Sequence, residues 1–115
     1  MNTATIIAQE VARATGVSIT EILSGRRDAR TVVARHMCAV LMRDVTPWGT
    51  PAIARALKLY DHTTILHALK TWPIRLQKNP LAARIGVARA AIDRRLAKQR
   101  AAARIVDEAS GHVVL

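Results

Sequence analysis

The spacing of apolar residues predicts two short helices at the start of the chain. Apolar side chains recur at helical intervals from residue 3 to residue 14, and Gly16 follows as a stop signal. Ser18 and Glu21 then form the pattern of a capping box, which predicts a second helix that Gly25 ends. The chain is therefore expected to open with a helical pair.

A polar segment rich in arginine leads into a longer predicted helix. The segment GRRDAR, residues 25–30, is expected to form a loop, and the helix runs from about Thr31 to Val45. The inner face of this helix carries Val33, Met37, Val40 and Leu41. Arg35 falls on the opposite side, so we expect its charge to lie in solvent or on a partner.

The next pattern is that of two helices joined by a short turn. Residues 46–51 are dense in turn formers, and Thr50 before Pro51 predicts an N-cap and the start of a short helix. After the turn at residues 58–60, Asp61 can cap a second helix, DHTTILHALKTW. Its inward stripe consists of Ile65, Ala68, Leu69 and Trp72, and its outward side carries Thr63, His67 and Lys70. This organisation is that of a helix-turn-helix.

A basic amphipathic segment follows. Pro73 is expected to interrupt or close the preceding helix, and Asn79 with Pro80 supplies a cap and a first-turn proline for a last one. The apolar stripe of this last helix is Leu81, Ile85, Ala88, Ile92, Leu96 and Ala103. We therefore expect a helix-turn-helix domain over residues 1–73 and a basic helical extension over residues 74–115.

Composition favours one compact, all-α fold. The chain has 115 residues, and half of them are apolar, but it contains no Phe, one Tyr and two Trp. Its core must therefore be built from Ala, Leu, Ile, Val and Met, which suit packed helices better than a β-sandwich.

The charge balance indicates an anionic partner. Lys and Arg number 18 against 8 Asp and Glu, for a formal charge of +10, and residues 74–115 are the more basic part. Most of these cations are Arg, whose planar fork of donors matches phosphate oxygens and guanine edges. Charge alone also fits an anionic membrane surface, but we favour nucleic acid.

Several kinds of chemistry find no support in the residues. Cys38 is the only cysteine, which excludes an internal disulfide and multi-cysteine zinc modules. His62 and His67 are five apart, off the spacing of two metal ligands on one helix face. The five glycines cannot form a GxxxxGK[ST] loop, which excludes nucleotide hydrolysis of that type. We expect no catalytic activity, metal or cofactor.

The N-terminal residues bear on location. They lack a basic region followed by an uninterrupted apolar run, and no stretch approaches the length of a membrane span. We therefore expect a cytoplasmic protein, intact from Met1 and associated with the nucleoid.

The first turn of the second helix of a helix-turn-helix usually contacts base edges. Asp can accept a hydrogen bond from cytosine, His can donate or accept at a purine edge, and Thr can contact a thymine methyl or a phosphate. The residues in this turn are Asp61, His62, Thr63 and Thr64. The alternative is that Asp61 only caps the helix and that the two threonines are solvated.

The motif DHTTILHA, preceded by TPAIARALKLY and by ILSGRRDARTVVARHMCAVLMRD, resembles the C-terminal DNA-binding domain of the bacterial replication initiator DnaA. The resemblance runs from about Ile6 to Lys70 and implies an all-α helix-turn-helix bundle with a Trp-repressor-like arrangement. The chain departs from the family where Ala34-Arg35-His36 replaces a common Pro-Arg-Gln and where Lys58-Leu59-Tyr60 replaces a Gly-Gly-Arg-like turn. Gly25 also replaces a commonly basic residue.

The resemblance implies a set of DNA contacts. Residues 61–64 would enter the major groove of a DnaA-box-like site, with Thr50 and Pro51 nearby. Arg27 would enter the minor groove, with Arg26 beside it. The other positions that the resemblance places near DNA are Arg35, His36, Arg43, Thr46 and Lys70.

Two functions of different classes follow. The first is a stand-alone relative of this domain that binds double-stranded DNA at DnaA-box-like sites and modulates replication initiation or transcription. The second is an adaptor that binds the initiator or its regulators through residues 74–115. This basic extension could lie along phosphates, pair with another copy or another protein, rest on an anionic membrane, which we rank last, or pack back on the domain.

Overall fold

The part of the chain that the structure describes contains helices and turns and no strand. The structure is a computed structural model that describes residues 2–59 and 61–109, with side chains described through Arg104. The elements are α1 (Thr3–Thr15), α2 (Ile19–Ile22), α3 (Ala29–Val45), α4 (Thr50–Ala56), α5 (Thr63–Lys78), the 3-10 turn η1 (Ala82–Arg84) and α6 (Ile85–Ala109). The expected all-α class is confirmed. None of the described helices is both long and apolar enough to cross a membrane.

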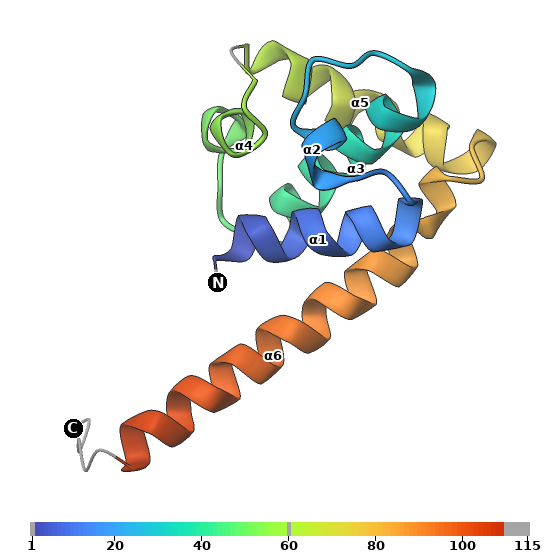
Figure 1. Cartoon of the computed structure of the whole chain (residues 1–115). Coiled ribbons are helices and arrows are strands. Elements are labelled where there is room, and N and C mark those ends of the chain that lie inside the picture. The colour runs from blue at the N-terminus through green and yellow to red at the C-terminus, as the bar shows by residue number, and fades with distance from the viewer. Residues whose placement is uncertain (1, 60, 110–115) are drawn as a thin grey trace.

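Helix α3 lies at the centre of the bundle and packs against α1, α2, α4 and α5 (Figure 1). Its expected inner residues, Val33, Met37, Val40 and Leu41, are all buried. Because neighbours cover α3 on several sides, burial extends beyond that stripe to Cys38, Met42 and even Arg35. A central helix of this kind holds the elements of the site in fixed relation to one another.

Side-chain caps start three of the helices. Asn2 and Ser18 each accept a hydrogen bond from the backbone N–H three residues on, at 2.8 and 3.1 Å. Asp28 does the same for α3 at 3.2 Å, so α3 begins two residues earlier than expected. Gly16 ends α1 in the left-handed conformation, with φ of 75°. The two expected N-terminal helices and the boundary at Gly16 are confirmed, but α2 ends at Ile22, three residues before the expected stop at Gly25.

A tight turn closes α4 before α5 begins. The Leu59 N–H donates to the Ala54 carbonyl at 2.8 Å, and the Lys58 N–H donates to the Arg55 carbonyl at 3.1 Å. These two bonds form a Schellman motif, which requires a left-handed residue just after the helix. Lys58 takes that conformation with φ of 58°, whereas Tyr60 lies outside the described residues.

The expectation that Pro73 interrupts or closes the second helix is wrong, because α5 continues through it to Lys78. Contacts on both sides of the proline hold the helix together. Trp72 is buried in the core, and the Arg75 guanidinium donates to the Nδ1 atom of His36 on α3. Pro73 itself is exposed, so its ring disturbs no packed neighbour. The expected division after residue 73 therefore falls within α5.

Helix α6 packs along α1 over its first half and extends past the bundle over its second (Figure 1). Ala88 and Ile92 are buried and belong to the same core as α1 and α3. Leu81, Ile85 and Leu96 are partly buried, whereas Ala103 is exposed. The start of the basic extension is thus part of the bundle.

Candidate nucleic-acid interface

The first turn of the second helix of the helix-turn-helix is presented to solvent. Asp61, His62, Thr63 and Thr64 are all exposed, and α5 begins at Thr63. The Asp61 carboxylate accepts a hydrogen bond from the Thr63 backbone N–H at 2.9 Å. This bond and that with the Thr63 side chain lower the pKa of Asp61, so its carboxylate is ionised at neutral pH. Asp61 therefore stabilises the helix start and also stays accessible to a partner.

Helix α4, which packs against α5, begins close to the predicted position. The helix cap is Gly49, one residue before the expected Thr50, which is instead the first helical residue. Pro51 is exposed and Thr50 is partly buried. The start of α4 therefore leaves Pro51 accessible to a partner.

The α2–α3 loop is held in place by Arg35, which contradicts the expectation that this side chain lies in solvent or on a partner. Arg35 is only 7% exposed. Its Nε donates to the Ile22 carbonyl at 2.8 Å, and its Nη2 donates to the carbonyls of Ser24 and Arg26 at 2.8 and 3.0 Å. The loop folds over α3, so a side chain opposite the helix's inner stripe is covered. Arg35 positions the loop rather than offering its charge.

The other end of the loop is fixed by a second set of contacts. The Arg26 Nε donates to the Asp28 carboxylate at 3.0 Å, and that carboxylate also accepts from the Thr31 hydroxyl at 2.9 Å. The Thr31 hydrogen bond lowers the pKa of Asp28. Arg30 donates to the Thr15 carbonyl at 2.9 Å. With its backbone held at both ends, the loop presents Arg26 and Arg27 as exposed cations.

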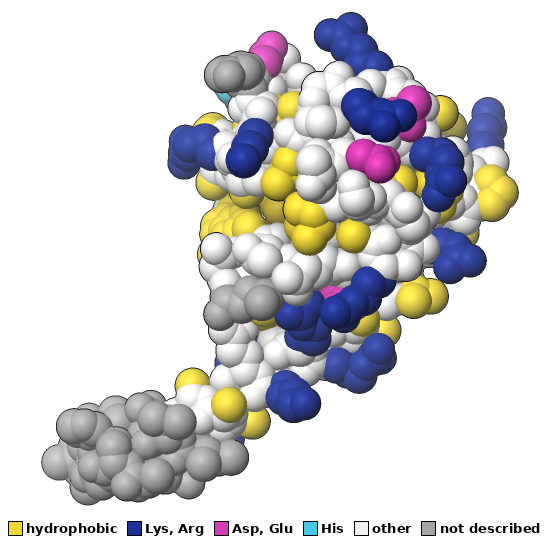
Figure 2. Space-filling model, viewed as in Figure 1, with side chains coloured by type: hydrophobic (Ala, Val, Ile, Leu, Met, Phe, Trp, Pro, Cys, Tyr) yellow, Lys and Arg dark blue, Asp and Glu magenta, His cyan; other side chains and the backbone are white. Residues whose placement is uncertain are grey.

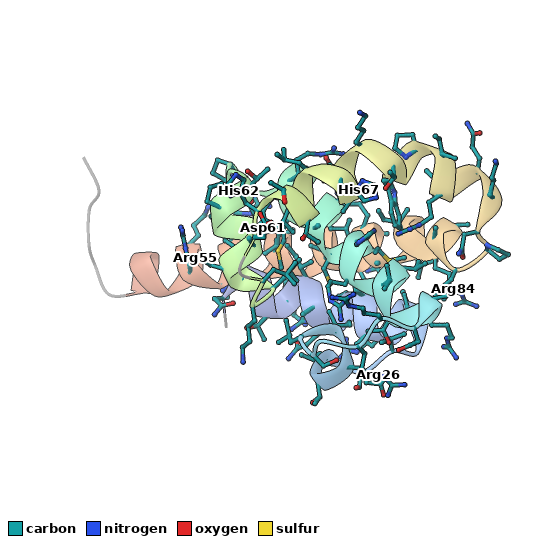
Figure 3. All side chains as sticks on the ribbon, turned by 90° about the horizontal axis from the view of Figure 1, so that it is seen from above. Arg26, Arg55, Asp61, His62, His67 and Arg84 are labelled. Atoms are coloured by element: carbon teal, nitrogen blue, oxygen red, sulfur yellow. The ribbon has the colours of Figure 1, made fainter. Side chains whose placement is uncertain are left out.

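The two groups of exposed residues lie on one side of the molecule. In Figure 1 the α2–α3 loop and the start of α5 are on the opposite side of α1 from α6. Figure 3, seen from above, shows Asp61 and His62 near one edge of this side and Arg26 near another. The structure thus presents an exposed helix terminus and an exposed basic loop on one side, which we call the α5–loop face (residues 26, 27 and 61–64).

His36, which the resemblance places near DNA, is buried and does not lie on this face. It is 9% exposed, and its Nδ1 accepts a hydrogen bond from Arg75. Burial, followed by the nearby charges of Arg75 and Arg35, lowers the pKa of His36 to about 4. His36 is therefore a neutral ring that joins α3 to α5.

The remaining predicted contacts differ in accessibility. Arg43 and Lys70 are exposed, and the Arg43 Nε donates to the Asp44 carboxylate at 2.9 Å. Thr46 donates its hydroxyl to the Met42 carbonyl and accepts from the Trp48 N–H, so it organises the turn after α3. Arg43, although it is paired with Asp44, and Lys70 are accessible at the surface, whereas the Thr46 hydroxyl is engaged within the chain.

Two exposed side chains near the start of α5 were not among the predicted contacts. Arg55 lies on α4, and His67 lies one turn along α5 from Thr63 (Figure 3). The spacing of His67 from Thr63 could have identified it, because residues four apart share a helix face. The sequence holds no comparable signal for Arg55, since its position depends on how α4 packs on α5.

The described residues contain no group of three His, Cys, Asp or Glu side chains that could hold a metal ion. Cys38 is fully buried among apolar side chains, and burial raises the pKa of its thiol to about 12. A thiol in this state is a packing group rather than a nucleophile.

Comparison with known proteins identifies the family of this arrangement. The family model described as bacterial dnaA protein helix-turn-helix matches residues 4–71. The chromosomal replication initiator protein DnaA of Aquifex aeolicus is 40% identical over 65 residues, which are 56% of this chain and 16% of that protein. Its counterpart in Mesorhizobium japonicum is 42% identical over 64 residues, 56% of this chain and 13% of that protein.

A third relative extends the match slightly. The DnaA protein of Nautilia profundicola is 32% identical over 73 residues, which are 64% of this chain and 17% of that protein. The chain thus covers less than a fifth of the length of each of these relatives, and the match falls on α1 to α5. On the match to residues 4–71, the chain belongs to the bacterial DnaA helix-turn-helix family.

Proposed function

We propose that this chain binds double-stranded DNA at DnaA-box-like sequences. The observation that carries the proposal is the α5–loop face, on which an exposed helix start and an exposed arginine pair share one side of a DnaA-type helix-turn-helix. Such a face offers one element to the major groove and another to the adjacent minor groove.

The side chains at the start of α5 have the chemistry to distinguish base pairs. The ionised Asp61 accepts hydrogen bonds and so suits a cytosine amino group. His62 and Thr63 can contact a purine edge and a thymine methyl. Thr64 follows them in the same turn, and by the family resemblance Thr50 and Pro51 would lie near the DNA as well. This part of the face would supply sequence preference.

The α2–α3 loop supplies charge at a fixed place. Arg27 would enter a narrow minor groove, where the negative potential is enhanced, with Arg26 beside it on the backbone. Arg35 fixes the loop from inside, and Arg43 and Lys70 are accessible for phosphate contacts. Together these contacts would set the register of α5 on the duplex.

The biological role that we propose is modulation of replication initiation or of transcription near the bound sites. The relatives are initiator proteins by name, and this chain matches only a small share of their length. Occupying the same class of site would alter access of the initiator to its sites.

A competition experiment tests the proposal. Labelled duplex carrying a DnaA box is bound by the full chain and challenged with unlabelled box duplex or scrambled duplex of equal composition, at physiological salt. We expect the box duplex to compete at least about 10³-fold better, the lower end for specific DNA-binding proteins. Equal competition by both duplexes would reject sequence-specific recognition.

A further inference from the structure

A second cluster of cations lies away from the α5–loop face. Arg13 on α1 and three cations on α6 line a common hollow of about 360 Å³, together with Glu10 and Ala91. The four cations, which we call the α1–α6 basic patch, are Arg13, Arg94, Arg95 and Lys98. Figure 2 shows Lys and Arg side chains gathered where α6 passes below α1.

A buried carboxylate organises this patch. The Glu10 side chain is 5% exposed, and its Oε2 accepts from the Arg13 Nη1 at 2.7 Å and from the Arg95 Nη1 at 2.8 Å. The two ion pairs orient both guanidinium groups, and the pair with Arg95 joins α6 to α1. One carboxylate cannot neutralise four cations, so the patch keeps a positive excess.

Arg94 and Lys98 supply most of the unbalanced charge. Both are exposed, and neither makes an ion pair with the residues that the structure describes. They are four residues apart on α6, so they project from the same face about 6 Å apart along the helix axis. Their position beside two fixed arginines makes a preformed anion-binding surface.

The chemistry of the hollow favours a phosphate backbone over a protein or a membrane. Among the residues that line the hollow, Ala91 is the one apolar residue. The large exposed apolar side chains of the described chain are Leu66, Ile74, Leu76 and Val87, and none of them lines the hollow. Protein interfaces use aromatic or bulky apolar side chains as anchors, and helices on a membrane surface insert such side chains into the lipid. Contacts to duplex phosphates need only cations.

We propose that the α1–α6 basic patch binds the phosphate backbone of a second DNA duplex, so that one molecule bridges two duplexes. Three of the four cations of the patch lie on α6, which is on the opposite side of α1 from the α5–loop face (Figure 1). A duplex on one face therefore leaves the other accessible. Recognition at the patch is independent of base sequence, since the patch offers cations to phosphates. The bridging form of this proposal rests on the proposed function, which supplies the first duplex.

A double substitution tests the patch with a matched control. The patch variant carries Arg94→Glu and Lys98→Glu, and the control carries Lys78→Glu and Arg84→Glu, which make the same change of charge at exposed positions outside the patch. Full-length proteins are bound to an immobilised box duplex, and a labelled duplex of unrelated sequence is then added. We expect the original chain and the control to capture the second duplex and the patch variant to lose capture at least 10-fold. Affinity of all three for the box duplex should agree within about threefold.

The salt dependence of the capture step gives a second readout. Each phosphate contact contributes about 0.9 to the slope of log K against log salt. The patch variant should therefore lower the slope of the capture step by about 2, while the slope for the box duplex stays the same. Equal capture by the patch variant and the original chain, or equal loss in the control, would overturn the proposal.

Further measurements separate this proposal from its rivals. If box binding fails in every protein, the proposed function is rejected, and the patch is then tested alone by the affinity of each protein for unrelated duplex. A patch variant that binds this duplex as well as the control does would overturn the patch proposal. Sedimentation without DNA tests whether capture depends on a dimer of the protein. A dimer that the original chain forms and the patch variant does not form would overturn the proposal. Patch-dependent binding of polyglutamate or of anionic vesicles, with none to duplex, would likewise overturn it.

Discussion

Arg35 is buried, yet it fixes the position of the exposed arginines of the α2–α3 loop. Its guanidinium donates to three carbonyls of the α2–α3 segment, at Ile22, Ser24 and Arg26, and is nearly enclosed. Three carbonyls that converge on one charged group define the path of the backbone between them. The exposed arginines of the loop therefore depend on a buried one for their position.

Replacing Arg35 with Ala should loosen the loop without removing a phosphate contact. We expect a loss of about 2–3 kcal/mol in the free energy of unfolding, typical of hydrogen bonds to a charged donor, measured by urea titration. DNA affinity should fall, but the salt slope should stay within about 0.3 of the original. Arg27→Ala is the matched comparison, because losing a true phosphate or groove contact should reduce that slope by about 0.9. A slope that falls equally in both variants would show that Arg35 contacts DNA directly.

His36 links pH to stability through its burial. Its folded-state pKa of about 4 is below the ordinary value of 6.5. Between these two values the unfolded chain binds a proton that the folded chain does not, so stability falls as pH decreases from 6.5 towards 4. The contribution of this residue is complete above pH 6.5.

The pH effect can be isolated with His36→Gln, which keeps a neutral hydrogen-bonding side chain. From pH 7 to pH 5 we expect the original chain to lose about 1–2 kcal/mol more unfolding free energy than the variant. Urea unfolding at both pH values measures this difference. Identical pH profiles would show that His36 is not held neutral in the folded state.

At the scale of elements, the turn between α4 and α5 carries a local conformational cost. Lys58 occupies the left-handed position of the Schellman motif, where a side chain is disfavoured and glycine is not. The turn keeps its geometry because its two backbone hydrogen bonds and the burial of Leu57 outweigh that cost.

Lys58→Gly should relieve this cost. We expect the free energy of unfolding to rise by about 1 kcal/mol, because a left-handed conformation costs a non-glycine residue about 1–2 kcal/mol. Lys70→Gly is the control, since it places glycine at an exposed position within α5 and should lower stability by about 1 kcal/mol. Thermal or urea unfolding measures both. A loss of stability in Lys58→Gly would contradict the strain argument.

Helix positions and caps could be predicted from the sequence, whereas coverage by neighbouring segments could not. Ser18 and Gly16 act where the local pattern places them, because caps depend on residues a few positions apart. The periodicity of α3 correctly identifies its inner stripe, yet it cannot show that a loop folds over the opposite side and buries Arg35.

The same limit explains the difference at Pro73. Pro73 normally ends a helix, but packing of Trp72 and the contact of Arg75 with His36 are long-range interactions that carry α5 past it. The exposure of residues 61–64 could be predicted because it follows from the turn and the amphipathic stripe of α5. The juxtaposition of α1 and α6 that builds the basic patch has no local signal.

At the scale of the whole molecule, α6 is both a structural element and a carrier of charge. Ala88 and Ile92 fill the core beside α1, and Glu10 binds Arg95 across the same contact. Its later residues, from Ala97 to Arg104, are exposed. The basic extension therefore cannot be removed at residue 73 without opening the bundle.

Two truncations should separate these roles. A chain ending at Pro73 loses Ala82, Ala88 and Ile92 from the core, so we expect it to unfold or aggregate. A chain ending at Gln99 keeps all of these residues and should retain cooperative unfolding. Circular dichroism during a thermal scan measures both. A stable, cooperatively folded 1–73 fragment would show that α6 is dispensable for the fold.

Whether residues 61–64 and the loop arginines contact neighbouring grooves is tested most directly by binding a set of box duplexes, each altered at one base pair, to three proteins. The three proteins are the original chain, Thr63→Ala and Arg27→Ala, and for the original chain we predict two adjacent runs of preferred base pairs. Thr63→Ala should lose about 1–3 kcal/mol of discrimination in one run only, and Arg27→Ala should lose preference only in the other. Variants that weaken every duplex equally and leave the pattern of preference unchanged would contradict this mode of binding.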